Sequence, residues 1–357
     1  MEHVIIALSG GVDSAVAAAL IVEQGYSAEG LFMKNWEEDN DYCTSDKDYK
    51  DALQVCDLIG IPLRSVDFST EYWNKVFKHF LDEYKIGRTP NPDILCNTEI
   101  KFNTFLKYAI ELGADKIATG HYAQLFRNSK SIDLGRGIDQ NKDQSYFLYG
   151  LNQKQLSKTI FPIGKMEKTS VREKAKELGF NNYSKKDSTG ICFIGERHFK
   201  EFLGHYLPAQ PGNIILKDGE IIGKHDGLMY YTIGQRQGLR IGGGYGTSEK
   251  PWYVLDKDME KNNLIVCQGN DNPYLYHRFL SCSKINWISG EIPNSEKITA
   301  KIRYRGNDTI CKINFTSEKS VSVEFKKPQF AIAPGQSIVF YEKDICLGGA
   351  IIDSRWN

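Results

Sequence analysis

The chain has 357 residues, 41% hydrophobic and 25% charged, ordinary values for a globular protein of two or three domains. Lys and Arg number 45, as do Asp and Glu, so the formal net charge of zero excludes a wholly basic nucleic-acid coat and a polyanionic tail. The charge is uneven, because residues 154–186 carry nine basic and three acidic side chains. This segment predicts a basic face that can meet phosphate.

The eight cysteines are scattered, without a CxxC pair or a His-rich spacing. A zinc ribbon or a secreted disulfide framework is therefore not expected. The apolar start of the chain is similar to a signal peptide, but a polar run at residues 9–14 interrupts it and no Lys or Arg precedes that run. We expect a cytoplasmic protein with reduced thiols and no membrane partner, because no later stretch approaches the length of a membrane span.

Alternating strand and helix patterns fill the first third of the chain. Short apolar runs predict strands at residues 4–8, 29–34, 63–68 and 116–119. Apolar residues at helical spacing, most of them followed by a glycine, predict helices at residues 13–24, 49–59, 70–86 and 98–112. Strands that alternate with helices of this length predict an α/β fold with a doubly wound parallel sheet. Such sheets bind ligands at the carboxyl ends of their strands.

The pattern changes in the second half of the chain. A further helix is predicted at residues 169–178, and the run 208–212 (PAQPG) indicates a domain boundary. From about residue 276 onward, apolar and polar residues alternate, for example at 301–305, 311–315 and 321–325. This period of two predicts a small antiparallel β-barrel or sandwich.

Residues 9–14 (SGGVDS) stand between the first predicted strand and the first predicted helix. Two glycines let the backbone come close to a ligand, the helix start offers N–H groups, and Ser9 and Ser14 add hydroxyl donors. Asp13 would repel phosphate unless Mg²⁺ lies between them. The pattern GxxxxGK(S/T) is absent from the sequence, so this is not the usual kinase or GTPase loop. A plain strand–helix turn that requires glycine is the alternative.

Two cysteine-containing runs carry further chemistry. In residues 89–97 (TPNPDILCN), two prolines fix the backbone, and Asp93 and Cys96 stand three apart just before a predicted helix. If Cys96 begins this helix, the helix dipole favours its thiolate, and Asp93 can exchange protons with a bound ring or a sulfur. Cys192 follows the pair Lys185 and Lys186, which would also favour a thiolate. We assign Cys43 no role and expect small buried hydrophobes at Cys56, Cys267, Cys282, Cys311 and Cys346.

The SGGVDS run resembles the loop of PP-loop ATP pyrophosphatases, which cleave ATP between its α and β phosphates and adenylate a carbonyl oxygen. With six further runs in order along the chain, the sequence resembles the bacterial tRNA-specific 2-thiouridylase family. These runs are residues 91–97 (NPDILCN), 118–122 (ATGHY), 142–148 (KDQSYFL), 187–195 (DSTGICFIG), 234–236 (GQR) and 251–254 (PWYV). We accordingly assign a PP-loop ATP-binding catalytic domain to residues 1–200, a central tRNA-contacting domain to 201–272 and a C-terminal antiparallel β-barrel to 273–357.

The resemblance implies a sulfur-transfer reaction. ATP would adenylate the oxygen at ring position 2 of the wobble uridine in tRNAs for Gln, Lys and Glu. Cys192 would carry a persulfide delivered by a sulfur-relay partner protein. Cys96 would be the nucleophile that liberates sulfide from it or resolves it as a disulfide, and Asp93 would act as general acid and base on the uracil ring. Direct attack of the persulfide on the ring remains an alternative.

The resemblance also assigns binding residues. ATP, with Mg²⁺, would contact Ala7, Leu8, Ser9, Gly10, Gly11, Val12, Asp13, Ser14, Met33 and Gly120. The tRNA would contact Asn91, Pro92, Asp93, Lys142, Asp143, Gln144, Arg303 and Tyr304. No resident metal site is expected.

Three alternatives stay open at this point. A PP-loop ligase that amidates a small molecule would share the ATP loop but would not explain the paired cysteines. A non-catalytic RNA-binding or redox-sensing protein would not consume ATP. An iron–sulfur cluster held by Asp93, Cys96 and Cys192 is chemically possible, since three ligands would leave one iron site open.

Overall fold

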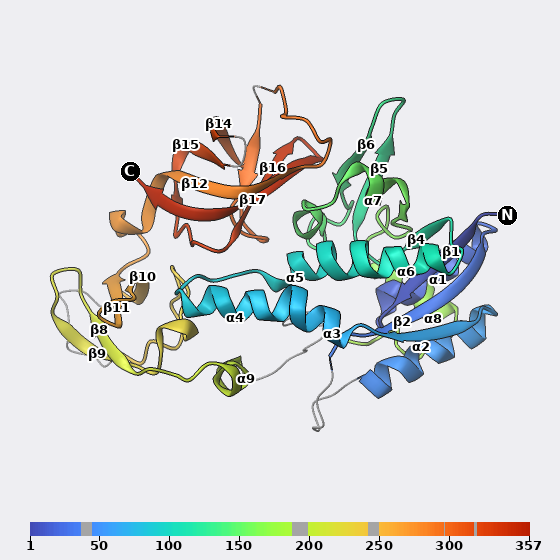
Figure 1. Cartoon of the computed structure of the whole chain (residues 1–357), viewed down its shortest axis with the longest axis horizontal. Coiled ribbons are helices and arrows are strands. Elements are labelled where there is room, and N and C mark those ends of the chain that lie inside the picture. The colour runs from blue at the N-terminus through green and yellow to red at the C-terminus, as the bar shows by residue number, and fades with distance from the viewer. Residues whose placement is uncertain (37–44, 188–198, 242–249, 296, 318–319) are drawn as a thin grey trace.

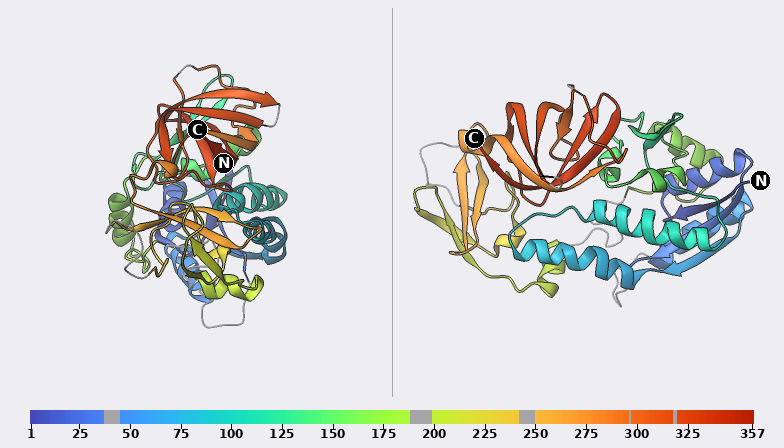
Figure 2. Two further views of the ribbon diagram at one scale, coloured as in Figure 1. Left: turned by 90° about the vertical axis from the view of Figure 1, so that its left-hand side faces the viewer. Right: turned by 45° about the horizontal axis from the view of Figure 1, so that its top comes forward.

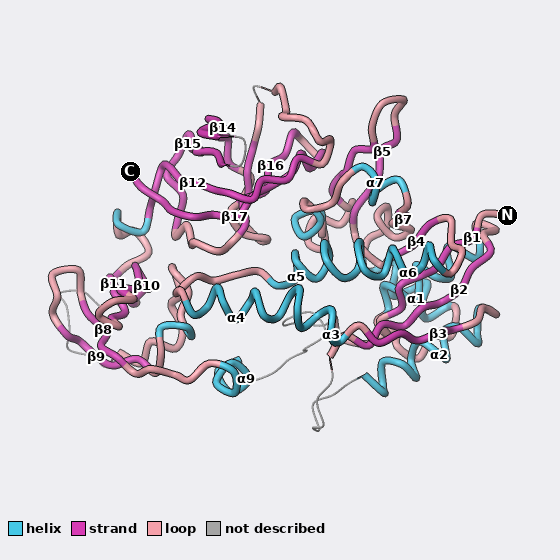
Figure 3. The backbone as a smooth tube through the Cα atoms, viewed as in Figure 1, coloured by secondary structure: helices cyan, strands magenta, loops and turns pink. Residues whose placement is uncertain are grey.

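The computed structural model describes residues 1–36, 45–187, 199–241, 250–295, 297–317 and 320–357. Within these residues the strands form a parallel sheet near the N-terminus, a small central sheet and a large antiparallel sheet (Figures 1 and 3). The short helical segments outside the sheets are η3 (Ser145–Leu148), α7 (Gln153–Ser157), α9 (Phe199–Tyr206), η4 (Leu228–Tyr230) and η5 (Pro273–Leu275). Of the helices in this described part of the chain, none is both long and apolar enough to cross a lipid bilayer.

The N-terminal sheet is parallel throughout and has the strand order β3-β2-β1-β4-β7. Its strands are β1 (His3–Leu8), β2 (Ser27–Lys34), β3 (Leu63–Asp67), β4 (Lys116–Ala118) and β7 (Thr159–Ile160). The order reverses beside β1, because β2 lies on one side of it and β4 on the other. The carboxyl ends of β1 and β4 therefore form the crevice in which such sheets bind ligands.

Helices cover both faces of this sheet because the residues of β1 alternate between two cores. Ile6 packs against the helices α1 (Val12–Glu23) and α2 (Ser45–Ile59), and α8 (Lys168–Glu177) packs on α1. Ile5 instead faces the core that includes Phe102 and Phe105. The α/β doubly wound fold predicted from the sequence is thus confirmed.

Two long helical runs cover the second face of the N-terminal sheet and lie side by side (Figure 2). One consists of α3 (Ser69–Tyr72), η1 (Trp73–Phe77) and α4 (Lys78–Lys85), and the other of α5 (Pro92–Leu95), η2 (Cys96–Phe105) and α6 (Leu106–Glu111). The second run begins at Pro92, six residues before the predicted start at residue 98, so that prediction was wrong. Asn91 accepts a hydrogen bond from the Asp93 N–H at 3.2 Å and thus caps the helix, and proline is favourable at its first position.

The central sheet has the order β10-β11-β8-β9 and lies at the end of the molecule opposite the N-terminus (Figure 1). Its strands are β8 (Gly212–Ile215), β9 (Ile221–His225), β10 (Trp252–Asp258) and β11 (Asn263–Gln268). The first of them starts at the end of the predicted PAQPG boundary.

The C-terminal strands form an antiparallel β-barrel, closed by pairing between β12 and β17. They are β12 (Tyr276–Trp287), β13 (Thr299–Lys301), β14 (Thr309–Ser317), β15 (Ser320–Phe330), β16 (Ser337–Glu342) and β17 (Ile345–Trp356). The hairpin of β5 (Ala123–Arg127) and β6 (Ile132–Arg136) joins the same sheet through β17, with Leu134 opposite Cys346. The barrel prediction is confirmed, while the domain boundaries at residues 200 and 272 stay predictions.

One predicted strand is mostly a turn. Strand β13 ends at Lys301, and the following residues bend so that the Gly306 N–H donates to the Arg303 carbonyl at 2.9 Å. The strand predicted from the alternating run 301–305 therefore stops at Lys301, and Arg303 and Tyr304 lie in the bend that follows. The glycine and asparagine that follow the run favour a turn, and the turn extends back over it.

The close approach of β4 to α1 gives a first prediction. A Cβ atom at Gly120 would lie 2.6 Å from the backbone nitrogen of Ser14, so Gly120→Ala must push the strand end and the helix start apart. We expect a loss of roughly 1–3 kcal/mol in unfolding free energy, measured by denaturant titration. In the control Gly223→Ala, the new methyl group would meet ordinary contacts at 3.6 Å, and equal losses in the two variants would contradict this account.

Candidate active site

The loop between β1 and α1 is closed by its two serine side chains. The Ser14 hydroxyl donates to the Gly11 carbonyl at 3.0 Å and accepts from the Ser9 N–H at 3.2 Å. The two hydroxyl oxygens are also 3.2 Å apart. Ser14 is buried beneath the loop whereas Ser9 is exposed, so Ser9 and the N–H groups at the helix start are placed to meet phosphate.

Glycine is required at the tip of this loop. Gly10 has a φ of +70°, and a Cβ there would lie 2.4 Å from the Asp48 carbonyl oxygen. The Gly10 carbonyl accepts hydrogen bonds from the Asn182 amide at 3.0 Å and the Lys185 ammonium at 3.1 Å. The loop is thus tied to the segment that follows α8 as well as to its own helix.

Asp13, in the first turn of α1, contacts residues from outside the loop. Both of its carboxylate oxygens lie 2.8 Å from the Lys168 ammonium, and Oδ1 also accepts the Tyr122 hydroxyl at 2.7 Å. Lys168 is buried at the start of α8, so its charge is neutralised by neighbours rather than by water. The negative charge of Asp13 is thereby held in place beside the loop.

The same ammonium reaches a second carboxylate. Lys168 lies 2.5 Å from Asp187, which also pairs with Lys142 and lies 3.6 Å from Arg172. Burial alone would raise the pKa of Asp187, but hydrogen bonds from Lys142 and Lys168 hold it below its ordinary value. Asp187 therefore links residues 9–14, the predicted ATP loop, to Lys142, one of the predicted tRNA contacts.

Met33 and Gly120 complete the predicted ATP contacts at the same edge of the sheet. Met33 is buried near the end of β2, and its carbonyl accepts a hydrogen bond from the Asn35 amide at 3.4 Å. Gly120 follows β4 and packs directly against the start of α1. The structure thus brings together the ATP contacts predicted from three separate strands.

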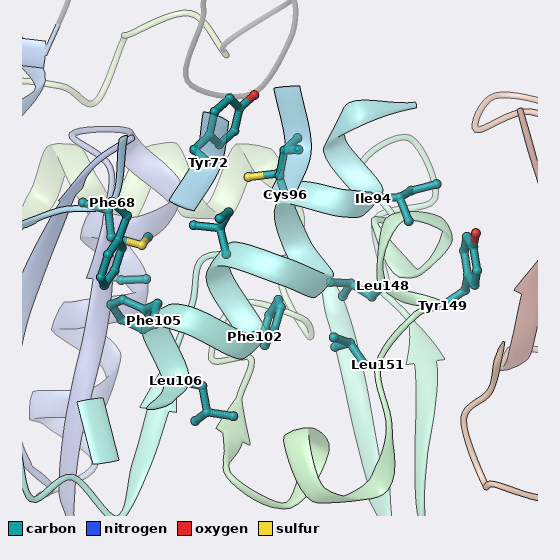
Figure 4. Packing of buried hydrophobic residues seen from close by; sticks show 14 of the residues in the cluster. Phe68, Tyr72, Ile94, Cys96, Phe102, Phe105, Leu106, Leu148, Tyr149 and Leu151 are labelled. Carbon is teal, nitrogen blue, oxygen red and sulfur yellow. The ribbon is translucent and has the colours of Figure 1, made fainter. Parts of the chain in front are cut away.

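Cys96 lies one helical turn inside the long helix rather than at its start. Its side chain is fully buried, and its sulfur points towards the Tyr72 side of the cluster in Figure 4. The dipole at the helix start therefore acts on it from a turn away. Asp93 stands on the first turn of the same helix and is partly buried.

The remaining described cysteines are buried, as predicted, at Cys56, Cys267, Cys282, Cys311 and Cys346. Burial raises the pKa of the Cys282 and Cys311 thiols to about 12, which leaves them unreactive at neutral pH. Cys192 and Cys43 lie outside the described residues.

The segment that leads into the catalytic helix is fixed from two sides. Lys257 of β10 donates to the Gly87 carbonyl at 2.9 Å, and Arg88 forms an ion pair with Asp353 of β17 at 2.7 Å. Thr89 is held by the barrel through both its N–H and its carbonyl. The central sheet and the barrel thus both position Asn91 and the residues after it.

The predicted tRNA residues at 142–144 differ in availability. Asp143 is buried and accepts hydrogen bonds from Gly137 and Ser145 at 3.0–3.1 Å. The Gln144 side chain accepts the Tyr122 N–H at 3.0 Å, while the partly exposed Lys142 makes its ion pair with Asp187. Asp143 and Gln144 therefore hold the segment in shape.

Arg303 and Tyr304 lie against that segment from the barrel. The Arg303 guanidinium donates to the carbonyls of Ile233 and Ala331 at 2.8 Å each. The Tyr304 ring lies 4.4 Å from the Phe147 ring, and burial raises its pKa to about 12. Both predicted residues are thus close to the 142–147 segment, but the Arg303 head is engaged by backbone.

Sequence reasoning missed two members of this site. Lys168 was one of nine basic residues in the segment 154–186, and Tyr122 was part of a matched run without an assigned role. The sequence does contain a signal that links Tyr122 to Asp13. The loop of residues 9–14 follows one predicted strand and Tyr122 follows another, so both are expected at the same edge of the sheet. No comparable signal in the sequence connects Lys168 to Asp13.

Comparison with known proteins agrees with this architecture. Family models described as "tRNA methyl transferase HUP domain", "tRNA methyl transferase PRC-barrel domain" and "Aminomethyltransferase beta-barrel domain" match residues 2–196, 200–268 and 277–352. A tRNA-specific 2-thiouridylase MnmA of Methylococcus capsulatus is 54% identical over 99% of this chain and 97% of its own. The protein of that name from Haemophilus influenzae is 56% identical over 99% of this chain and 94% of its own.

Among solved structures, a 4-thiouridine synthetase–RNA complex with bound ATP is 20% identical, covering 58% of this chain and 50% of its own with a TM-score of 0.35. A likeness at this level carries no argument about function. The fold and the SGGVDS loop define a PP-loop protein with a central PRC-barrel domain and a C-terminal β-barrel. Its relatives place it further: the chain belongs to the tRNA-specific 2-thiouridylase family.

The buried Lys168 generates a second prediction. Lys168→Met leaves Asp13 and Asp187 facing each other without their shared cation, so we expect a loss of roughly 3 kcal/mol or more in unfolding free energy at pH 7. The loss should shrink as the pH falls and Asp187 becomes protonated. Lys174→Met is the control, because its pair with the half-exposed Glu23 is worth about 0–1 kcal/mol. Equal losses in the two variants would contradict a central role for Lys168.

Proposed function

We propose that this protein replaces the oxygen at ring position 2 of the wobble uridine in tRNA with sulfur, using ATP. The observation that carries the proposal is that Lys168 and Asp187 link Asp13 of the loop to Lys142, while Cys96 shares a buried core with Ala7 and Met33 of the same sheet. The relatives are named for tRNA-specific 2-thiolation, which supports tRNA as the substrate. We propose the cytoplasm as the location. We expect the tRNAs for Gln, Lys and Glu to be the acceptors.

In the activation step the uracil oxygen attacks the α-phosphate of ATP, and the bond to the β-phosphate breaks. The oxygen becomes part of an AMP leaving group, and pyrophosphate departs. The N–H groups at the start of α1 and the Ser9 hydroxyl would stabilise the phosphates, and Lys168, held by Asp13, would supply positive charge beside them. Met33 and Gly120 would shape the nucleotide pocket.

Mg²⁺ fits the loop, because Asp13 offers the carboxylate oxygens that this ion prefers and they lie beside the phosphate-facing turn. Bound there with ATP, the ion would neutralise phosphate charge. Without it, Lys168 and Tyr122 already hold the Asp13 carboxylate in a single orientation.

In the sulfur step, Cys192 carries a persulfide received from a sulfur-relay partner. The Cys96 thiolate attacks the Cys192 sulfur, which releases sulfide and leaves a Cys96–Cys192 disulfide. The sulfide attacks ring position 2, AMP leaves, and a thiol reductant restores both cysteines. Direct attack of the terminal sulfur on the ring, followed by the same disulfide, gives the same products. Asp93 would move the proton on the ring.

The tRNA is proposed to cross the surface between the 142–147 segment and the barrel. Lys142 would exchange its contact with Asp187 for an RNA phosphate, while Asp143 and Gln144 fix the backbone around it. Arg303 would hold the Ile233 and Ala331 carbonyls at the edge of this surface. Tyr304 would add a ring edge, and Asn91 and Pro92 would border the flipped uridine.

The proposal is tested by the dependence of ATP cleavage on its acceptor. We expect AMP release with tRNA that has a wobble uridine, and none with the same tRNA carrying cytidine there. AMP release that needs only a small molecule would favour an amidating ligase, and binding without AMP release would favour a non-catalytic RNA-binding protein.

A third prediction concerns Asp13. Asp13→Ala should reduce tRNA-dependent AMP formation by a factor of about 100 or more, because it removes the carboxylate that would hold Mg²⁺ and leaves Lys168 misplaced. The affinity for tRNA, measured by filter binding, should change little. AMP formation at the wild-type rate would show that ATP binds elsewhere.

The fourth prediction separates the two cysteines. Cys96→Ser should accumulate one extra sulfur on Cys192 when sulfur-relay proteins are supplied, because the resolving thiolate is missing. Cys192→Ser should accept none, and both variants should lose thiolation. Intact-protein mass spectrometry distinguishes them, with Cys43→Ser as a control that behaves as wild type. Persulfide found on Cys96 in Cys192→Ser would reverse the proposed order.

A further inference from the structure

A cavity beside the helical run that begins at Ser69 has no part in the reaction described above. It measures about 270 Å³ and is lined by Trp36, Ser69, Thr70, Trp73 and Tyr206. Trp36 follows the end of β2 and Ser69 begins the helix after β3, so the cavity lies at the ligand-binding edge of the sheet. Tyr72, which neighbours Cys96 in Figure 4, meets the Trp36 ring edge-on at 6.1 Å.

The walls of this cavity are aromatic rings held in fixed positions. Trp36 and Trp73 stack at 5.9 Å with an interplanar angle of 28°, and Tyr206 meets Trp73 edge-on at 5.7 Å. Phe77 packs beneath Trp36 at 4.8 Å. Trp73 nevertheless stays 41% exposed, so a large apolar ring faces solvent at the cavity.

Trp36 supports the exposed Trp73 ring from within. It is only 7% exposed, and its buried Nε1–H finds no hydrogen-bond partner among the described residues, so the hydrogen-bonding groups that a ligand can reach lie at the rim. Ser69 and Thr70 add hydroxyl groups at the rim.

We propose that this cavity binds one unpaired nucleobase of the tRNA anticodon loop, next to the uridine that is modified. Planar rings with an apolar face and hydrogen-bonding edges match RNA bases, which stack on aromatic side chains when they are unpaired. Pockets for drug-sized ligands measure roughly 300–1,000 Å³, so this one suits a single base rather than a whole ATP molecule. The inference rests on the proposed function, since it presumes tRNA as substrate.

The test combines protein variants with altered RNA. Anticodon stem–loops are prepared in which each base flanking the wobble uridine is removed in turn, and their affinities are measured for the full-length protein. Loss of the base that occupies the cavity should weaken binding to the wild type about tenfold. Trp73→Ala should weaken binding of the intact RNA about as much and show no further loss with that abasic RNA.

Matched variants separate stacking from general damage. Trp73→Phe keeps an aromatic ring at the exposed position and should retain most of the affinity. Trp356→Ala is the control, because Trp356 is similarly exposed at 40% but belongs to strand β17 of the barrel, where it stacks on Phe279 of β12. It should bind every RNA as the wild type does.

Three results would overturn the inference. The losses from Trp73→Ala and from each abasic position could simply add, or the Trp356→Ala variant could lose as much affinity. Trp73→Ala could also raise the KM for ATP with RNA affinity unchanged, which would assign the cavity to adenine. If the wild type thiolates tRNA while these tests fail, only this inference fails; if the wild type thiolates no tRNA, the proposed function itself is wrong.

Discussion

The buried ammonium of Lys168 is the contact on which the site depends. It neutralises both Asp13, in the loop at residues 9–14, and Asp187, the partner of Lys142, with distances of 2.5–2.8 Å. Removing a buried cation from two carboxylates is far costlier than breaking a surface pair. Nucleotide that competes for Lys168 or Asp13 would therefore also change the environment of Asp187, which precedes Cys192 by five residues in the sequence.

A second constraint is the packing of the central sheet and the barrel against the segment before helix α5. Gly87, Arg88 and Thr89 contact these two sheets, so the start of the helix that carries Asp93 and Cys96 is fixed by both. The β5–β6 hairpin adds a further connection, because it extends the barrel sheet from within the N-terminal half. A reaction that must align a nucleotide, a base and a sulfur gains from such rigidity.

Local signals made much of this predictable. The alternation of apolar runs with glycine-ended helices gave the doubly wound sheet, and SGGVDS lies at the strand–helix junction where its glycines predict it. Long-range pairs were not predictable: Lys168 and Asp13 are 155 residues apart, and nothing in the basic helix distinguishes that lysine from its neighbours. The turn at Arg303 was missed because the alternating pattern of 301–305 was given more weight than the turn residues that follow it. The helix start at Pro92 was missed because the prolines were taken to precede the helix, although Asn91 can cap it.

The central claim is that the protein activates the wobble uridine with ATP and transfers cysteine-bound sulfur to it. The most direct measurement is mass spectrometry of nucleosides from unmodified tRNA after incubation with the protein, ATP and a sulfide source. The account predicts that sulfur replaces oxygen in the wobble uridine only, and only when ATP is present. An unchanged uridine, or a methyl group in place of sulfur, would contradict it.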